Sequence, residues 1–167
     1  FIFLIIVISC LLRLWGIDFG LPHTNSRPDE DLIVCPALNF FSGDFNPHRF
    51  TYGSLYMYFI YVLYSIYYAV GLMLGKYHST ADLFFEYAVW PTNFYLISRV
   101  ASVFFGVATV YLVYLISKKL FGQKTAYFSS WFMAIAYLHI RSSHFGVTDV
   151  PMIFFILCSV LFIVSAY

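Results

Sequence analysis

Long apolar runs, separated by short polar connections, dominate this chain. Within each run apolar side chains recur on every face, as lipid and neighbouring helices require of a buried helix. A membrane-spanning helix needs about 20 such residues. The pattern predicts transmembrane helices at 1–16, 100–117, 126–140 and 150–167, and a further apolar helix at 52–75. The predicted fold class is an all-α polytopic membrane protein.

The connection between helices 100–117 and 126–140 indicates their orientation. Residues 118–124 contain three lysines, and short connections rich in lysine lie on the cytoplasmic side of a membrane. Helix 126–140 would then run outward, which places residues 139–149 at the external face. Helix 100–117 would run inward and begin beside Arg99, also at the external face.

If helix 1–16 runs outward, the segment 17–98 begins and ends at the external face. It must then cross the membrane either not at all or twice. Its apolar segment 52–75 is rich in tyrosine, which prefers the headgroup level. We therefore expect that segment to lie along the membrane as an interfacial helix. The alternative is a true span followed by a short crossing near 83–90, which Asp82 and Glu86 disfavour. The tyrosines are Tyr52, Tyr56, Tyr58, Tyr61, Tyr64, Tyr67 and Tyr68.

A second interfacial helix is expected at about 29–41, ended by the turn-forming residues 42–44. The chain starts at Phe1 and stops at Tyr167, both inside apolar runs, so we expect an N-terminal fragment of a longer protein.

Composition narrows the class further. The chain is 62% hydrophobic and 10% charged, whereas soluble domains carry about 25% charged residues. The net charge of +1 excludes the basic stripe of a nucleic-acid-binding protein. The three cysteines show no metal-binding or redox spacing, and those inside apolar runs are interpreted as small buried hydrophobes.

Three consecutive carboxylates follow the first helix, at Asp29, Glu30 and Asp31. One acid is ordinary in the first turn of a helix, where the dipole stabilises it by about 0.3–1 kcal/mol. Three at a membrane surface repel one another and resist dehydration. We interpret Asp29 and Glu30 as candidate catalytic residues, and Asp31 as a solvated neighbour.

The second candidate segment lies at 144–151. Asp149 before Val-Pro is a good helix start, which alone would explain it. The predicted orientation, however, places Asp149 and His144 on the same face as Asp29. Together with Glu30, these two residues could hold a divalent cation or direct a substrate.

Three arginines are predicted on the external side: Arg27, Arg99 and Arg141. Arg99 heads an apolar helix and could simply extend to the interface. The planar guanidinium also suits a lipid phosphate, because it donates two parallel hydrogen bonds.

The order of short motifs resembles the N-terminal part of GT-C glycosyltransferases of the protein O-mannosyltransferase and aminoarabinose transferase type. The Asp-Glu pair after the first helix is its most specific element. The others are Phe19-Gly20-Leu21-Pro22, Ala37-Leu38-Asn39-Phe40, Ser42-Gly43-Asp44-Phe45-Asn46-Pro47, Tyr52-Gly53-Ser54-Leu55, Arg99 at a helix start, Lys119-Leu120-Phe121-Gly122 and Asp149-Val150-Pro151.

That resemblance implies a first external loop with two helices along the membrane and assigns the base to Asp29. It also places Glu30 and Asp149 among further active-site acids and matches Arg99 to an arginine typical of that helix start. Tyr52 is an additional candidate. The chain reads Thr51-Tyr52-Gly53 where aminoarabinose transferases have Glu-Lys-Pro, so the lysine for the lipid phosphate and the metal-binding glutamate are absent there.

The function expected is a multi-pass membrane glycosyltransferase with its active site on the periplasmic, extracellular or lumenal face. It would move a sugar from a polyprenyl-phosphate donor to an acceptor hydroxyl of a protein, glycan or lipid, with inversion. Two alternatives stay open: a transporter, and a noncatalytic lipid-binding membrane subunit. The acids cluster at one surface rather than at the bilayer midplane, which disfavours transport.

Overall fold

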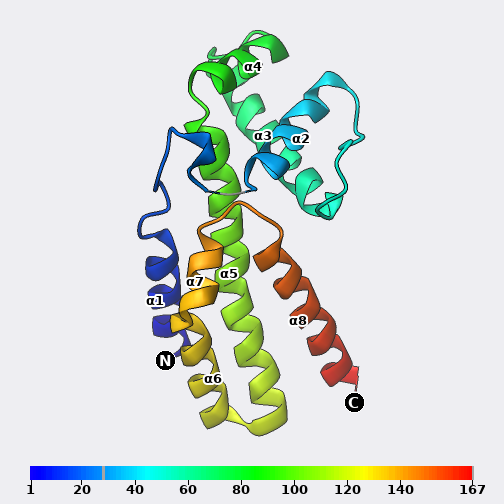
Figure 1. Cartoon of the computed structure of the whole chain (residues 1–167). Helices are drawn as coiled ribbons and strands as arrows, with labels where there is room; N and C mark the ends of the chain where they lie inside the picture. Colours follow the sequence, from blue (N-terminus) through cyan, green and yellow to red (C-terminus); the bar gives the residue numbers. More distant parts are fainter. Residues whose placement is uncertain (28, 167) are drawn as a thin grey trace. The chain divides into compact units, whose positions relative to one another are not determined.

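The computed structural model describes residues 1–27 and 29–166, and in this part of the chain all regular structure is helical (Figure 1). This confirms the predicted all-α class. The α-helices are α1 (Ile2–Leu14), α2 (Asp31–Asn39), α3 (Ser54–Met73), α4 (Thr80–Val89), α5 (Thr92–Phe121), α6 (Gln123–Ile135), α7 (Tyr137–Ser143) and α8 (Asp149–Ala166). Two short 3₁₀ helices are η1 (Thr24–Ser26) and η2 (Phe40–Ser42).

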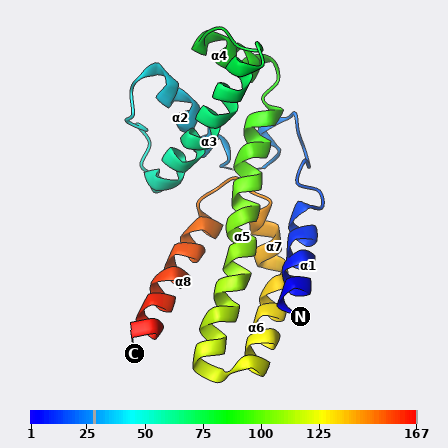
Figure 2. The same ribbon diagram turned by 180° about the vertical axis from the view of Figure 1, so that it is seen from behind.

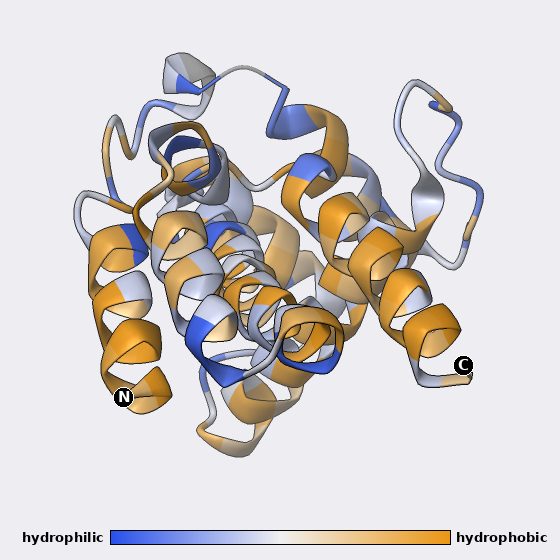
Figure 3. Cartoon of the chain, turned by 90° about the horizontal axis from the view of Figure 1, so that it is seen from below, coloured by the Kyte–Doolittle hydropathy of each residue, from blue (hydrophilic) through white to orange (hydrophobic). Residues whose placement is uncertain are grey.

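Three of the helices are long and apolar enough to cross a membrane: α3, α5 and α8. The helix α1 is apolar but shorter. Figure 3 shows the helices largely in the colour of hydrophobic residues, with hydrophilic residues mainly in the connections. These helices support the assignment as an integral membrane protein.

The chain divides into two compact units, which are described separately. The bundle unit comprises Phe1–Ile17 and Val100–Tyr167, and the loop unit comprises Asp18–Arg99. The helix α5 contributes its first eight residues, 92–99, to the loop unit and the rest to the bundle unit.

In the bundle unit, α1 lies against α6 and α7 (Figure 2). A core between α1, α5 and α6 contains Ile5, Val110 and Ala134, which are almost completely buried. The rings of Phe154 and Phe155 on α8 contact Phe105 of α5, with centroids 5.2 and 5.8 Å apart. Aromatic packing thus joins α8 to the long helix.

In the loop unit, α2 packs on α3, and the buried face of α2 contains Ile33, Val34, Ala37 and Leu38. Gly43, in the left-handed conformation with φ 91°, follows η2 and ends this helical segment, as the turn residues predicted. The predicted helix at about 29–41 is therefore present as α2 followed by η2.

Two tyrosines of α3 form hydrogen bonds within the protein. The hydroxyls of Tyr56 and Tyr64 are buried and donate to the backbone oxygens of Ser98 and Phe94, at 3.0 and 2.9 Å. Packing against the start of α5 accounts for these two residues without a lipid headgroup. The interfacial placement of α3 stays a prediction.

The helix boundaries differ from the predicted ones at three places. The helix α5 starts at Thr92, immediately after Pro91, rather than at residue 100. The helix α4 was not predicted; Ser79 and Asp82 form a capping box that starts it. The predicted helix 126–140 is interrupted at Ala136, whose extended backbone separates α6 from α7.

Candidate active site

The two acids Asp29 and Glu30 occupy different environments, although they are neighbours in the chain. Asp29 is exposed and has φ 66°, in the left-handed region that aspartate tolerates better than most residues. Its backbone oxygen accepts a hydrogen bond from Leu32 N at 3.2 Å. The sharp backbone turn directs two consecutive side chains to opposite surroundings.

Tyr52 holds the exposed acid. Its hydroxyl, which comes from the segment just before α3, donates to Oδ2 of Asp29 at 2.9 Å. Two residues that the sequence marked as separate candidates are thereby in direct contact. A hydrogen bond of this kind fixes the orientation of a carboxylate that solvent otherwise leaves mobile.

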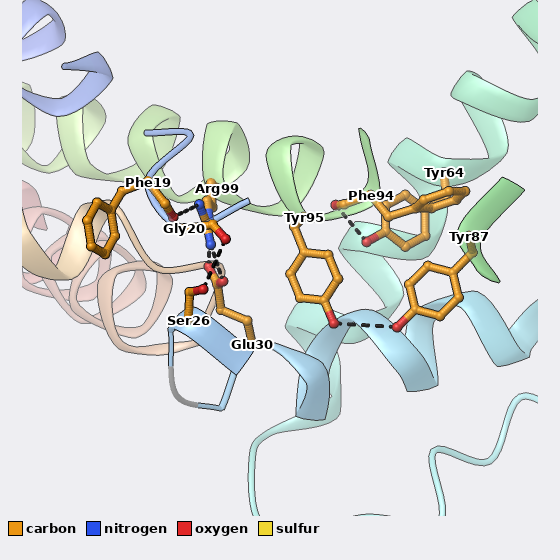
Figure 4. Close-up of polar contacts among 9 residues, drawn as sticks. All are labelled: Phe19, Gly20, Ser26, Glu30, Tyr64, Tyr87, Phe94, Tyr95 and Arg99. Atoms are coloured by element: carbon orange, nitrogen blue, oxygen red, sulfur yellow. Dashed lines mark hydrogen bonds and ion pairs between the residues drawn. The ribbon is translucent and has the colours of Figure 1, made fainter. Parts of the chain in front are cut away.

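Glu30 is fully buried and pairs with Arg99 (Figure 4). The Nε and Nη2 atoms of Arg99 donate to Oε1 and Oε2 of Glu30 at 2.9 and 2.7 Å. Nη1 of the same guanidinium donates to the backbone oxygen of Phe19 at 3.0 Å. The arrangement is a bidentate, charge-neutral pair, the strongest form of side-chain ion contact.

This pair ties three parts of the loop unit together. Glu30 caps the start of α2, where its backbone oxygen accepts from Val34 N at 2.9 Å, and Arg99 lies in the second turn of α5. Phe19 belongs to the segment that follows α1. The acid and the arginine therefore fix the turn in which Asp29 sits.

Arg27, another sequence candidate, lies in the same segment. It is half-buried, and its guanidinium carbon lies 5.3 Å from the ring centroid of Phe19. Cation–π contact of this kind holds a cation without consuming all its hydrogen-bond donors.

The remaining candidates belong to the bundle unit. Asp149 is exposed and begins α8, as its place before Val-Pro predicted. His144 follows α7 and is half-buried. Arg141 is exposed in the last turn of α7, with its guanidinium 5.8 Å from the ring of Phe145.

No group of three metal-ligating side chains occurs among the residues that the structure describes. Of the three expected ligands, Glu30 does not fit a cation in this arrangement, because Arg99 occupies both of its oxygens. Asp149 and His144 alone fall short of the usual ligand set for a divalent ion.

Sequence reasoning missed a polar cluster around Glu86 in the loop unit. Glu86 on α4 accepts hydrogen bonds from Tyr67 (2.8 Å), Asn93 (2.9 Å) and Tyr77, and Lys76 lies 2.7 Å from its carboxylate. Burial raises the pKa of Glu86, but these donors outweigh it and lower the pKa to about 2. The cluster fastens α4 to α3 and α5 and leaves no oxygen of this acid free for chemistry.

The comparison with known proteins gives one match. Residues 92–167, a little under half of the chain, match the family model of dolichyl-phosphate-mannose-protein mannosyltransferases. No curated protein and no solved structure matches. The matched segment includes Arg99, His144 and Asp149, whereas Asp29 and Glu30 precede it. Over residues 92–167 the chain thus carries the signature of this mannosyltransferase family, and its all-helical, apolar structure is consistent with a GT-C membrane glycosyltransferase.

Proposed function

We propose that this glycosyltransferase takes its sugar from a polyprenyl-phosphate donor, and that Asp29 is the base that activates the acceptor hydroxyl. The family description supports a dolichyl-phosphate donor and a protein acceptor. The observation that carries the proposal is the state of Asp29, an exposed carboxylate on a fixed backbone turn, oriented by Tyr52.

A general base must be accessible and must keep a free lone pair. Oδ2 of Asp29 accepts from Tyr52, and among the described residues Oδ1 has no hydrogen-bond donor. Oδ1 can take a proton from an acceptor hydroxyl while that oxygen attacks the anomeric carbon of the donor. The bond to the lipid phosphate breaks in the same step, so a single displacement inverts the anomeric centre.

Glu30 and Arg99 serve this reaction as positioning residues. Both are fully buried and their charges cancel, so a pair without net charge holds the turn that carries Asp29.

The leaving phosphate needs a positive partner, which lowers the barrier by stabilising the charge that develops. We expected Arg99 in this role, but its Nε and Nη2 atoms already donate to Glu30. Arg27 and Arg141 are then the predicted arginines for the phosphate. A divalent cation near His144 and Asp149 also stays a proposal, which removal of metal by a chelator would test.

The test uses the full-length protein in membranes, with a polyprenyl-phosphate mannose and a serine- or threonine-containing peptide. We expect transfer to the hydroxyl and a product of inverted anomeric configuration by NMR. Nucleotide sugars should not replace the lipid donor. Retention of configuration, or transfer from a nucleotide sugar alone, would overturn the proposal, and solute uptake into vesicles without sugar transfer would favour a transporter.

A further inference from the structure

Arg13 is a fully buried arginine inside the apolar helix α1, and none of the predicted active-site contacts involves it. Its side chain is the largest in the bundle unit to be completely shielded, and the salt bridges of the described residues give it no acidic partner. A charge in such surroundings is costly and marks a site that needs it. What surrounds the guanidinium indicates its purpose.

The guanidinium lies at the break between α6 and α7. Nη1 donates to the backbone oxygen of Ala134 at 3.0 Å, and Nη2 to that of Met133 at 3.4 Å. These carbonyls precede Ala136, where the extended backbone (φ −61°, ψ 108°) interrupts the helical hydrogen-bond ladder. A carbonyl without a donor is costly in an apolar bundle, and Arg13 supplies donors to two carbonyls at the break.

Arg13 also holds the helix that follows the break. Nη2 lies 2.8 Å from Nδ1 of His139 on α7, and arginine has no acceptor. His139 must therefore accept at Nδ1 and carry its proton on Nε2 when neutral. On the same helix, Ser143 completes α7 immediately before His144.

A second contact fixes the far end of α7. The helix approaches α5 at Gly106, where an added Cβ would lie 2.5 Å from Oγ of Ser143 and 3.1 Å from Nε of Arg13. Distances below 3.0 Å force a displacement. Ser143 already donates to the backbone oxygen of His139 at 2.7 Å, so its rotation breaks a hydrogen bond. A larger residue at 106 would therefore displace the side chain of Ser143 and press on that of Arg13.

We infer that Arg13 and Gly106 are positioning residues for the segment 144–149. Arg13 contacts α7 at His139, and Gly106 gives the end of α7 room against α5. The chain then passes from α7 through residues 144–148 into α8 (Figures 1 and 2). The inference rests on the proposed function, which includes a divalent cation near His144 and Asp149. The device works through the backbone: the arginine stabilises the break, and the break sets the direction of the chain that carries them.

The test compares Gly106→Val, which adds a Cβ and two methyl groups, with the control Ala69→Val, which adds two methyl groups at an exposed position of α3. The double variant Gly106→Val with Ser143→Gly relieves part of the clash. Arg13→Lys keeps the charge but loses the guanidinium fork. Each is made in the full-length protein, and hydrogen exchange, melting temperature, kcat and KM for sugar transfer are measured.

We expect Gly106→Val to speed amide exchange of residues 137–149 at least tenfold and to lower kcat about tenfold or more, with a melting temperature close to that of the parent. Ser143→Gly should restore part of both losses, and Arg13→Lys should show the same pattern as Gly106→Val. Ala69→Val should change neither quantity.

Unchanged exchange in Gly106→Val overturns the inference, and so does faster exchange with full kcat. If kcat falls across the variants only in proportion to the fall in melting temperature, the inference is also overturned, since that result indicates a purely structural role. Absence of sugar transfer in the unmodified protein would remove the proposed function, and the exchange rates would then decide by themselves whether the two residues hold the segment.

Discussion

At the scale of the residue, adjacent identical charges acquire different roles through one backbone turn. The backbone of Asp29 has a positive φ and its carboxylate lies at the surface. The next residue, Glu30, is buried in an ion pair with Arg99. The value of such a pair lies in what breaking it costs. Removing one partner leaves an unpaired buried charge and lowers the stability of the folded state by about 3–5 kcal/mol. Replacing both partners by apolar residues often leaves the stability unchanged.

This contrast gives a double-mutant prediction. Glu30→Met and Arg99→Met should each lower the melting temperature of the solubilised protein strongly. The double variant should be more stable than either single variant. A double variant whose loss equals the sum of the two single losses would show that the two charges are not coupled.

Sequence reasoning identified Asp29, Glu30 and Arg99 as important but did not pair the last two. The contact joins residues 69 positions apart, and no local pattern encodes a distance of that kind. Asp149 at the start of α8 was predictable because helix caps are local. The burial of Arg13 against the α6–α7 break depends on packing that only the fold shows.

At the scale of the element, helices of this chain are fastened by tyrosine hydroxyls and single acids. The helix α4 is the clearest case: it has ten residues, one fully buried leucine, and the Glu86 cluster at its end. So short a helix is marginal alone. Its position therefore depends on the ionised state of Glu86.

The pH dependence of stability tests this dependence. The pKa of Glu86 is about 2 in the folded chain, below its ordinary value of 4.5, so the folded state binds the proton less tightly than the unfolded state. The stabilisation is complete above about pH 4.5 and is lost as the pH falls toward 2. We expect the melting temperature of the parent to exceed that of Glu86→Gln by a constant amount above pH 5, and this difference to shrink below pH 4.5. A difference that does not change with pH would contradict the assignment.

At the scale of the whole molecule, the sequence predicts the all-helical class correctly, because lipid leaves few alternatives for the backbone. The break at Ala136 and the early start of α5 at Thr92 escaped prediction, since both depend on contacts with other helices. The orientation in the membrane stays a prediction, which rests on the lysines of 118–124.

Labelling of single cysteines tests that orientation. In a variant free of the native cysteines, Asn46→Cys and Thr148→Cys should react with a membrane-impermeant maleimide from outside, and Lys119→Cys only after permeabilisation. His78→Cys distinguishes the two placements of α3: external labelling indicates an interfacial helix, and internal labelling a true span. Residues 46 and 148 on opposite sides would contradict the predicted topology.

The central claim is that Asp29 is the catalytic base, and the matched pair Asp29→Asn and Asp31→Asn tests it most directly. Both variants remove one charge from the same turn and change the shape of the side chain little. We expect Asp29→Asn to lower kcat at least 100-fold with its melting temperature retained, since general-base catalysis contributes about 10²–10⁴-fold. Asp31→Asn should stay within about threefold of the parent. Parental turnover by Asp29→Asn, or an equal loss in both variants, would contradict the claim.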